Sequence, residues 1–431
     1  MKRLALVAVV AWVGVFAACA LGSDGGGGEG ALSWVRVTES EDRELRLEVA
    51  VRRYEAAGLP SLTLASAVHV ADRSYYQRLQ SMLDEKDLVL FEGVKPAGLR
   101  EDVPASASGK RRLTEDRVRL VMLLFRRAER AVDEGGDDGV GPAGAGGLGE
   151  LGEFFEERGD HESVGWLAIA GVDAWGNPVR IEGEGGVVDV VSLGADGEPG
   201  GTGAAADIRY SDLEPLSAAE LGEVEGIQAQ LARALRLRFQ LEEMDETGEN
   251  WRNADLSMGE IRERIRAAGG DPEPLFGQLQ GTGLSGRVVG LLLRFIEILP
   301  GAQPRAKMMM IEMLGEAEGL LETGAGPIGE EMLSVIIDER DDVAVGALAE
   351  VLDGEAVREG WEELAIIYGA GHMPGIHDRV TAQFGYEPVG AEWLAAMGVD
   401  LDRSGISPME HRMLRMQLRR QLAAMREAAG E

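Results

Sequence analysis

Short apolar segments that each end at a polar side chain limit the folds open to this chain more than any other feature. Residues 61–70 (SLTLASAVHV) and 87–91 (DLVLF) have the composition of buried strands. The segment between them, 73–84, places its apolar side chains on one helical face and follows Asp72, a residue type that caps helices. A strand, a helix and a strand joined by short links predict a parallel βαβ unit.

A third strand of this kind comes much later in the chain. Residues 364–368 (LAIIY) are apolar, and a Gly-Ala-Gly-His turn leads from them into a helix that extends to about residue 383. His69, Glu92 and His372 then all stand at, or just past, the carboxyl end of a strand. Because open α/β sheets bind ligands at those ends, we expect the three side chains to converge. The predicted fold class is α/β, with a mixed, mainly parallel sheet and flanking helices.

Charge and composition narrow the classes of function. The chain has 431 residues, of which 45% are apolar, so it has enough material for real cores. It carries 75 acidic and 43 basic side chains, a formal net charge of −32. Binding to nucleic acid without sequence preference requires the opposite balance, a surplus of Lys and Arg. We therefore predict no nucleic-acid partner.

The first 32 residues have the pattern of an export signal and a tether. Lys2 and Arg3 precede an apolar stretch that ends at Cys19, and residues 20–32 are rich in glycine. Phe-Ala-Ala-Cys resembles a bacterial lipobox, which would make Cys19 a lipidated residue and a membrane anchor; cleavage after Ala20 and plain secretion is the alternative. Cys19 is the only cysteine, so no disulfide forms within the chain. We expect an exported protein of the bacterial cell envelope, lipid-anchored, periplasmic or secreted.

Several segments together resemble the TraB/GumN family, which is related to the TIKI-type metal-dependent proteases. Two of them match the family's G-x-x-H motifs, as SAVH at 66–69, with serine in place of glycine, and as GAGH at 369–372. The family's glutamate after a strand matches Glu92, and its downstream Glu-Arg pair ends at Arg340. Asp341 stands where the family often has asparagine.

A second resemblance lies inside the first, to the C-terminal domain of the major pseudopilin of type II secretion. DAWGNPVRI at 173–181 and VDVVSLGADGEPGGTG at 188–203 follow that family's pattern, with Ala174 in place of a proline. The hydrophobic helix by which pseudopilins assemble does not precede this segment. The resemblance therefore implies an inserted small α+β domain without filament assembly.

These resemblances divide the chain into six predicted segments, two of which form one domain. They are a signal peptide at 1–19, a tether at 20–32, a TraB-like domain at 33–112 and 214–398, the pseudopilin-like insert at 113–213 and a C-terminal helix at 399–431. The last helix has a stripe of Met and Leu beside Arg412, Arg415, Arg419 and Arg420. That pattern suits a membrane surface, and packing on the body or on a second copy is the alternative.

The residues at the strand ends have the chemistry of a metal centre. Two imidazoles and a carboxylate, from His69, His372 and Glu92, are able to hold a divalent transition metal and leave a position open for water. The resemblance implies catalytic roles for these three and for Arg340, whose forked donors suit an oxyanion or a substrate carboxylate. The alternative is structural: polar residues satisfied at strand ends, and an Arg340 paired with the acidic neighbours on its own helix.

Four other polar residues have less specific surroundings. We expect Tyr368 to belong to the core and His377 to lie on a solvated helix face. His161 and His411 are predicted to be structural.

In the insert, Asp196 and Asp207 bracket a glycine-rich loop, whose freedom lets backbone carbonyls such as that of Leu193 turn inward. Calcium takes six to eight oxygen ligands of these two kinds, and the pseudopilin resemblance implies calcium binding here. Ala204 and Ala205 replace acidic residues that are common in that family, which weakens the predicted site. A metal-free turn is the alternative.

Taken together, the sequence predicts an exported metal-dependent hydrolase that acts on a peptide or protein substrate and carries a calcium-binding insert. The alternative is a non-catalytic lipoprotein of the cell envelope that binds a peptide or a partner, or a secretion-related interaction protein. The sequence leaves the oligomeric state open.

Overall fold

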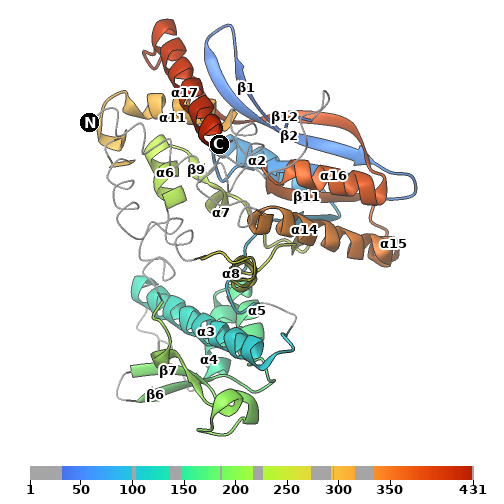
Figure 1. The fold of residues 1–431 in the computed structure, drawn as a ribbon, viewed down its shortest axis with the longest axis vertical. Helices are drawn as coiled ribbons and strands as arrows, with labels where there is room; N and C mark the ends of the chain where they lie inside the picture. The colour runs from blue at the N-terminus through green and yellow to red at the C-terminus, as the bar shows by residue number, and fades with distance from the viewer. Residues whose placement is uncertain are drawn as a thin grey trace. The chain divides into compact units, whose positions relative to one another are not determined.

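The structure of the chain, a computed structural model, describes residues 32–99, 103–135, 147–184, 187–216, 227–272, 293–294, 296–315 and 334–429 (Figure 1). The predicted signal peptide, Cys19 and nearly all of the tether lie outside these residues. None of the described helices is both long enough and apolar enough to cross a bilayer. The chain forms two compact units: residues 1–93, 226–255 and 265–431 make up the first, and residues 94–225 and 256–264 the second.

A seven-stranded mixed sheet forms the centre of the first unit. Its order is β1–β2–β3–β11–β5–β10, and β12 also pairs with β2. Strands β3, β11, β5 and β10 are parallel neighbours, whereas β2 runs antiparallel to β1, β3 and β12. The bounds are β1 (Val35–Glu39), β2 (Glu44–Glu55), β3 (Ser61–Ala67), β5 (Leu88–Phe91), β10 (Trp251–Asn253), β11 (Glu363–Gly369) and β12 (Glu387–Asp400).

Helices flank this sheet, which confirms the predicted fold class. Helices α14 and α16 cover part of it through Val345, Leu348, Met373, Ile376 and Val380, which share one core with the apolar side chains of β3, β5 and β11 (Figure 1). The helices of this unit are α2 (Arg73–Leu83), α6 (Ile227–Leu235), α7 (Gln240–Glu243), α11 (Ala302–Gly315), α14 (Asp338–Glu350), α15 (Ala356–Glu359), α16 (Met373–Phe384) and α17 (Pro408–Ala429); β4 (Val70–Ala71) pairs with β9 (Arg238–Phe239). Helix α8 (Met258–Ala267) lies mostly in the second unit.

The predicted βαβ unit is present with one change. Its two strands, β3 and β5, are not neighbours, because β11 lies between them and pairs in parallel with both. The late strand therefore brings His372 between the two polar residues of the early strands.

The prediction that the Asp72 side chain caps α2 is wrong. Asp72 occupies the N-cap position, but its side chain makes no capping bond. Its carboxylate accepts hydrogen bonds from Lys307 Nζ at 2.9 Å and from the Gly398 amide at 3.0 Å. The hydroxyls of Tyr75 and Tyr76 in α2 donate to the carbonyls of Ser66 and Val68, each at 2.8 Å, and so fix the turn that carries His69.

The second unit is a small α+β domain. Its antiparallel sheet has the order β6–β7–β8, and the long helix α3 shares a core with it through Val121, Phe125, Val190 and Ile208. The predicted start of the insert at residue 113 falls inside α3. The bounds are α3 (Ala107–Gly135), α4 (Leu148–Glu157), α5 (His161–Ala170), β6 (Arg180–Glu184), β7 (Val187–Ser192) and β8 (Ile208–Arg209), with 3-10 turns at Gly194–Asp196, Gly203–Ala205 and Tyr210–Asp212.

Candidate functional site

Four polar side chains follow the carboxyl ends of four adjacent parallel strands in the first unit. His69 comes shortly after β3, His372 after β11, Glu92 directly after β5 and Asp255 shortly after β10. The amide of Glu92 donates to the carbonyl of Ile367 at 2.9 Å, which ties the end of β5 to β11. The sheet thus brings the three residues named from the sequence to neighbouring strand ends and adds a fourth.

Glu92 is a buried carboxylate that remains ionised. Its Oε1 accepts a hydrogen bond from Arg340 Nη2 at 2.6 Å, its Oε2 accepts one from the Gly369 amide, and 9% of its side chain is exposed. Burial by itself would raise the pKa of Glu92, but the charges of Arg340, His372 and His69 and the Gly369 hydrogen bond outweigh it and lower the pKa to about 2.

Arg340 does not pair with the acids of its own helix, so that structural alternative is wrong. Asp255 binds its guanidinium in a bidentate manner, with Nε to Oδ1 at 2.8 Å and Nη2 to Oδ2 at 2.7 Å. Its Nη1 lies 3.4 Å from both the Ile336 carbonyl oxygen and His372 Nε2. All five N–H groups of the guanidinium therefore face an acceptor. An oxyanion would have to displace one of the two long contacts.

His372 lies at the N-cap of α16 and is fully buried. Its Nδ1 is 2.7 Å from Asp341 Oδ1, and its Nε2 is 3.6 Å from Glu92 Oε1. Burial raises the pKa of Asp341, while the neighbouring His372 and Arg379 act in the opposite direction. Nδ1 of His372 therefore contacts Asp341, and the other ring nitrogen, Nε2, is the one that lies near Glu92.

His69 contributes less to this cluster. Its side chain is partly exposed, and its charge helps to lower the pKa of Glu92, so it lies within electrostatic reach of that carboxylate. Among the described residues, no group of three or more His, Cys, Asp or Glu side chains is arranged to hold a metal ion. Within the predicted ligand set, His372 and Glu92 are the two residues whose side chains lie close together, with Nε2 and Oε1 3.6 Å apart.

The predictions for three other polar residues have different outcomes. Tyr368 is a core residue as predicted, and its hydroxyl donates to the Ala254 carbonyl. His411 is structural as predicted, since it is buried with its Nε2 at 2.7 Å from Glu312 Oε1. The solvated position predicted for His377 is wrong: the ring is partly buried, its Nδ1 is 2.9 Å from the Tyr54 hydroxyl, and burial lowers its pKa.

Sequence reasoning missed Asp255. The side chain is completely buried and is the main partner of Arg340. A signal for it exists, because it is an acid that comes two residues after the short segment Trp251–Asn253, much as Glu92 follows its own strand. That segment is too short for its alternation to predict a strand.

The glycine-rich loop of the second unit is curled around its own backbone. A Cβ on Gly201, whose φ is +80°, would overlap the carbonyl oxygen of Ala205, so only glycine fits there. Asp207 Oδ1 accepts a hydrogen bond from the Gly200 amide at 2.9 Å, and Asp196 Oδ1 accepts one from the Glu198 amide at 3.2 Å. Leu193 directly precedes this loop. The ligand atoms that this loop would offer to a metal ion are all oxygens, and oxygen ligands suit calcium better than a transition metal.

Residues 139–211 match the family model of type II secretion system protein G. The match confirms the pseudopilin-like resemblance over this stretch, which includes β6, β7, β8 and the glycine-rich loop. No curated protein and no solved structure matches the chain. The TraB/GumN resemblance of the first unit stays a prediction.

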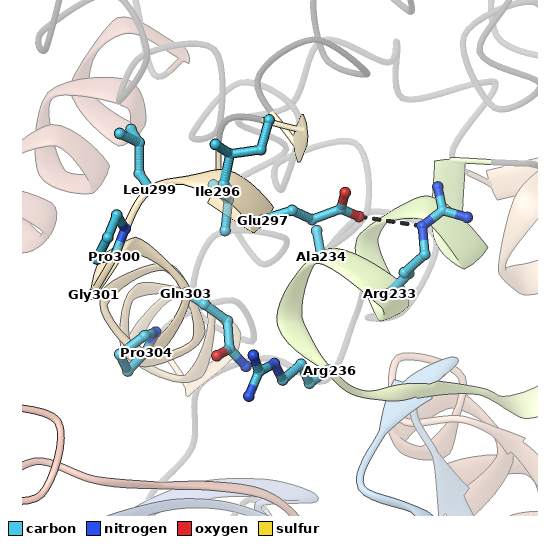
Figure 2. Close-up of a pocket in the computed structure, with 11 residues that line it drawn as sticks. Arg233, Ala234, Arg236, Ile296, Glu297, Leu299, Pro300, Gly301, Gln303 and Pro304 are labelled. Carbon is cyan, nitrogen blue, oxygen red and sulfur yellow. Dashed lines mark hydrogen bonds and ion pairs between the residues drawn. The ribbon is translucent and has the colours of Figure 1, made fainter.

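A hollow of about 420 Å³ lies elsewhere in the first unit, between the end of α6 and the start of α11 (Figure 2). Glu297 and Arg233 form an ion pair at 3.2 Å across it. Its lining contains no histidine and none of the residues of the strand-end cluster, so we assign the candidate chemistry to the cluster and not to the hollow. The lining residues are Arg233, Ala234, Arg236, Ile296, Glu297, Ile298, Leu299, Pro300, Gly301, Gln303 and Pro304.

Proposed function

We propose that this chain is an exported hydrolase of peptide or similar acyl bonds that uses a divalent transition metal held by His69, Glu92 and His372. One observation carries the proposal: His372 Nε2 and Glu92 Oε1 face each other at 3.6 Å at the ends of neighbouring strands. A histidine nitrogen and a carboxylate oxygen are the atom types that would hold a divalent transition metal at these strand ends.

Each residue has a distinct task in this proposal. When bound, the metal lowers the pKa of a water molecule and polarises the scissile carbonyl. Glu92 supplies an ionised carboxylate at neutral pH because its pKa is held at about 2. His372 supplies its Nε2 atom, and Arg340, fixed by Asp255, holds Glu92 in place. His69, on the partly exposed side, completes the ligand set from the third strand end.

A second candidate is a binding protein without catalysis. The observation that favours it is the position of Arg340, whose guanidinium contacts both Glu92 and His372 and so stands in for a cation between them. In that case the cluster stabilises the strand ends, and a peptide or partner binds without being cleaved.

The cell-envelope location rests on two supports. The first 19 residues have the pattern of an export signal that ends at Cys19. The match of residues 139–211 to a type II secretion protein favours a secretion-related or envelope protein. We include a calcium ion in the loop between Asp196 and Asp207 in this proposal.

Metal analysis of the purified mature protein separates the two candidates. We expect about one transition-metal ion per chain after incubation with Zn²⁺, Mn²⁺ or Co²⁺, and cleavage of a mixed peptide library detected by mass spectrometry. Glu92→Gln and His372→Ala should lose the ion and lower the cleavage rate by about 10²- to 10⁴-fold, as expected for loss of an acid–base or metal-binding group.

The matched control is His411→Gln. His411 is also a buried histidine bonded to a carboxylate, Glu312, but it lies between α11 and α17 and outside the cluster. It should lose stability and keep the metal. A folded wild-type protein that binds none of the three metals would contradict the hydrolase and favour the binding protein.

A further inference from the structure

His372 has a hydrogen-bonding group on each side of its ring, and the two impose one arrangement of protons. Asp341 Oδ1 lies 2.7 Å from Nδ1, and Arg340 Nη1 lies 3.4 Å from Nε2. An ionised carboxylate only accepts hydrogen bonds and a guanidinium only donates them. The neutral ring satisfies both neighbours only when Nδ1 carries the proton and Nε2 has the free lone pair.

Asp341 can reach His372 because the residue of α16 that faces it, Gly375, has no side chain. Asp341 lies in the first turn of α14 and is completely buried. Its second oxygen, Oδ2, lies against Gly375, and a Cβ on Gly375 would overlap that oxygen. Arg379 Nη1 contacts the same oxygen at 3.4 Å and donates to the Gly375 carbonyl at 3.1 Å. Gly375 and Arg379 together form a seat for the carboxylate between two packed helices.

We propose that Asp341, seated against Gly375, is a positioning residue that fixes the Nδ1–H tautomer of His372 and leaves the Nε2 lone pair to accept from Arg340, on the side of the ring where Glu92 lies. The consequence for metal binding rests on the proposed function, whereas the tautomer itself does not. Partners of this kind typically change the metal affinity of a site by about 10- to 100-fold when they are removed. Asp341 therefore acts through His372 and does not touch the metal.

Nitrogen-15 NMR of the histidine rings in the metal-free full-length protein tests the assignment directly. The chain has five histidines, so a His372→Gln variant identifies the His372 signals. We expect a protonated Nδ1 and an unprotonated Nε2 in the wild type. Asp341→Asn keeps an accepting oxygen and should keep this tautomer, whereas Asp341→Leu should show a mixture of both. A wild-type ring protonated at Nε2, or an unchanged tautomer in Asp341→Leu, would overturn the proposal.

Zinc titration of the same variants supplies the second measurement. Asp341→Leu should weaken Zn²⁺ binding by about 10- to 100-fold and Asp341→Asn by less. Asp342→Asn is the matched control, because Asp342 is the exposed neighbour that binds Arg379 Nε at 2.6 Å; it should bind zinc as the wild type does.

The outcomes separate the two proposals. A wild-type protein that binds no Zn²⁺ but shows the expected tautomer would contradict the hydrolase and leave the assignment of Asp341 intact. If Asp341→Leu does not fold, Asp341→Asn decides: a kept tautomer with weaker zinc binding is the expected result. Zinc binding equal to that of the wild type in Asp341→Asn would then overturn the role of the carboxylate.

Discussion

At the scale of single residues, burial raises the pKa of Glu92 and the neighbouring positive charges lower it, and the charges have the larger effect. Its carboxylate loses most of its hydration, yet a guanidinium at 2.6 Å and a backbone amide replace that hydration with fixed donors. Asp341 shows the other balance. Its side chain is completely buried, and this burial raises its pKa by more than the hydrogen bond to His372 and the charges of His372 and Arg379 lower it. Two carboxylates in one cluster thus have opposite pKa shifts, and the difference between them is that Glu92 accepts a guanidinium hydrogen bond at 2.6 Å whereas the Arg379 guanidinium approaches Asp341 only to 3.4 Å.

The pH dependence of stability should reveal these opposite shifts. A carboxylate with a lowered pKa stabilises the fold above its ordinary pKa of 4.5, and this stabilisation is lost as the pH falls through about 2. Comparing wild type with Glu92→Gln by urea unfolding at pH 6 and near pH 2, we expect the difference in free energy of unfolding to shrink by about 3 kcal/mol.

Asp341→Asn is the comparison for this measurement. Because the pKa of Asp341 is raised, protonation favours the folded state, and the wild type should gain stability relative to the variant as the pH falls. A difference that is constant with pH for Glu92→Gln would show that the carboxylate has an ordinary pKa in the folded protein.

At the scale of elements, the sequence predicts the parallel strands well and their neighbours less well. Residues 61–67, 88–91 and 363–369 are short, mainly apolar runs, and a polar residue follows each of them within three positions, so the sequence indicates both the strands and the candidate site. Strand β12 is not predicted, because its glycines and its two irregularities in register against β2 break the alternation of a strand. Asp255 and Arg340 are bonded across 85 positions of sequence, and no local pattern reports such a pair.

The glycine-rich loop makes a testable prediction at this scale. Its glycines lose much backbone freedom on folding, so an ion that binds only the folded loop should offset that cost. Calcium at a hundredfold excess over its Kd should stabilise the loop by about 2.7 kcal/mol, seen as a rise in Tm of several degrees. Asp207→Ala should abolish the rise, and magnesium should not produce it, because magnesium demands a tighter octahedral shell.

Glu198→Ala is the control, since Glu198 lies in the same loop, is exposed, and is not one of the proposed ligands. An equal Tm with calcium and with chelator would show that the pseudopilin-like domain is kept here without its ion. The alanines at 204 and 205 would then be the reason.

At the scale of the whole molecule, two large apolar cores among the described residues share no residue. One core, which includes Leu64, is built from the mixed sheet with α14 and α16. The other, which includes Phe125, is built from α3, α4, α5 and the antiparallel sheet. Surface ion pairs are worth only about 0–1 kcal/mol each, so apolar cores such as these contribute more to the stability than the surface pairs do.

Separate cores predict separate unfolding in the intact chain. Differential scanning calorimetry should show two transitions, because each core is large enough to unfold cooperatively by itself. Leu64→Ala and Phe125→Ala each remove a fully buried side chain and should each destabilise one core by about 2–5 kcal/mol. Leu64→Ala should lower one transition and leave the other in place, and Phe125→Ala should do the reverse. Calcium should raise only the transition that Phe125→Ala lowers, since the loop and Phe125 belong to the same unit. A single transition that both substitutions lower together would show that the two units fold as one, and the pseudopilin-like segment would then be part of the host fold and not an insertion into it.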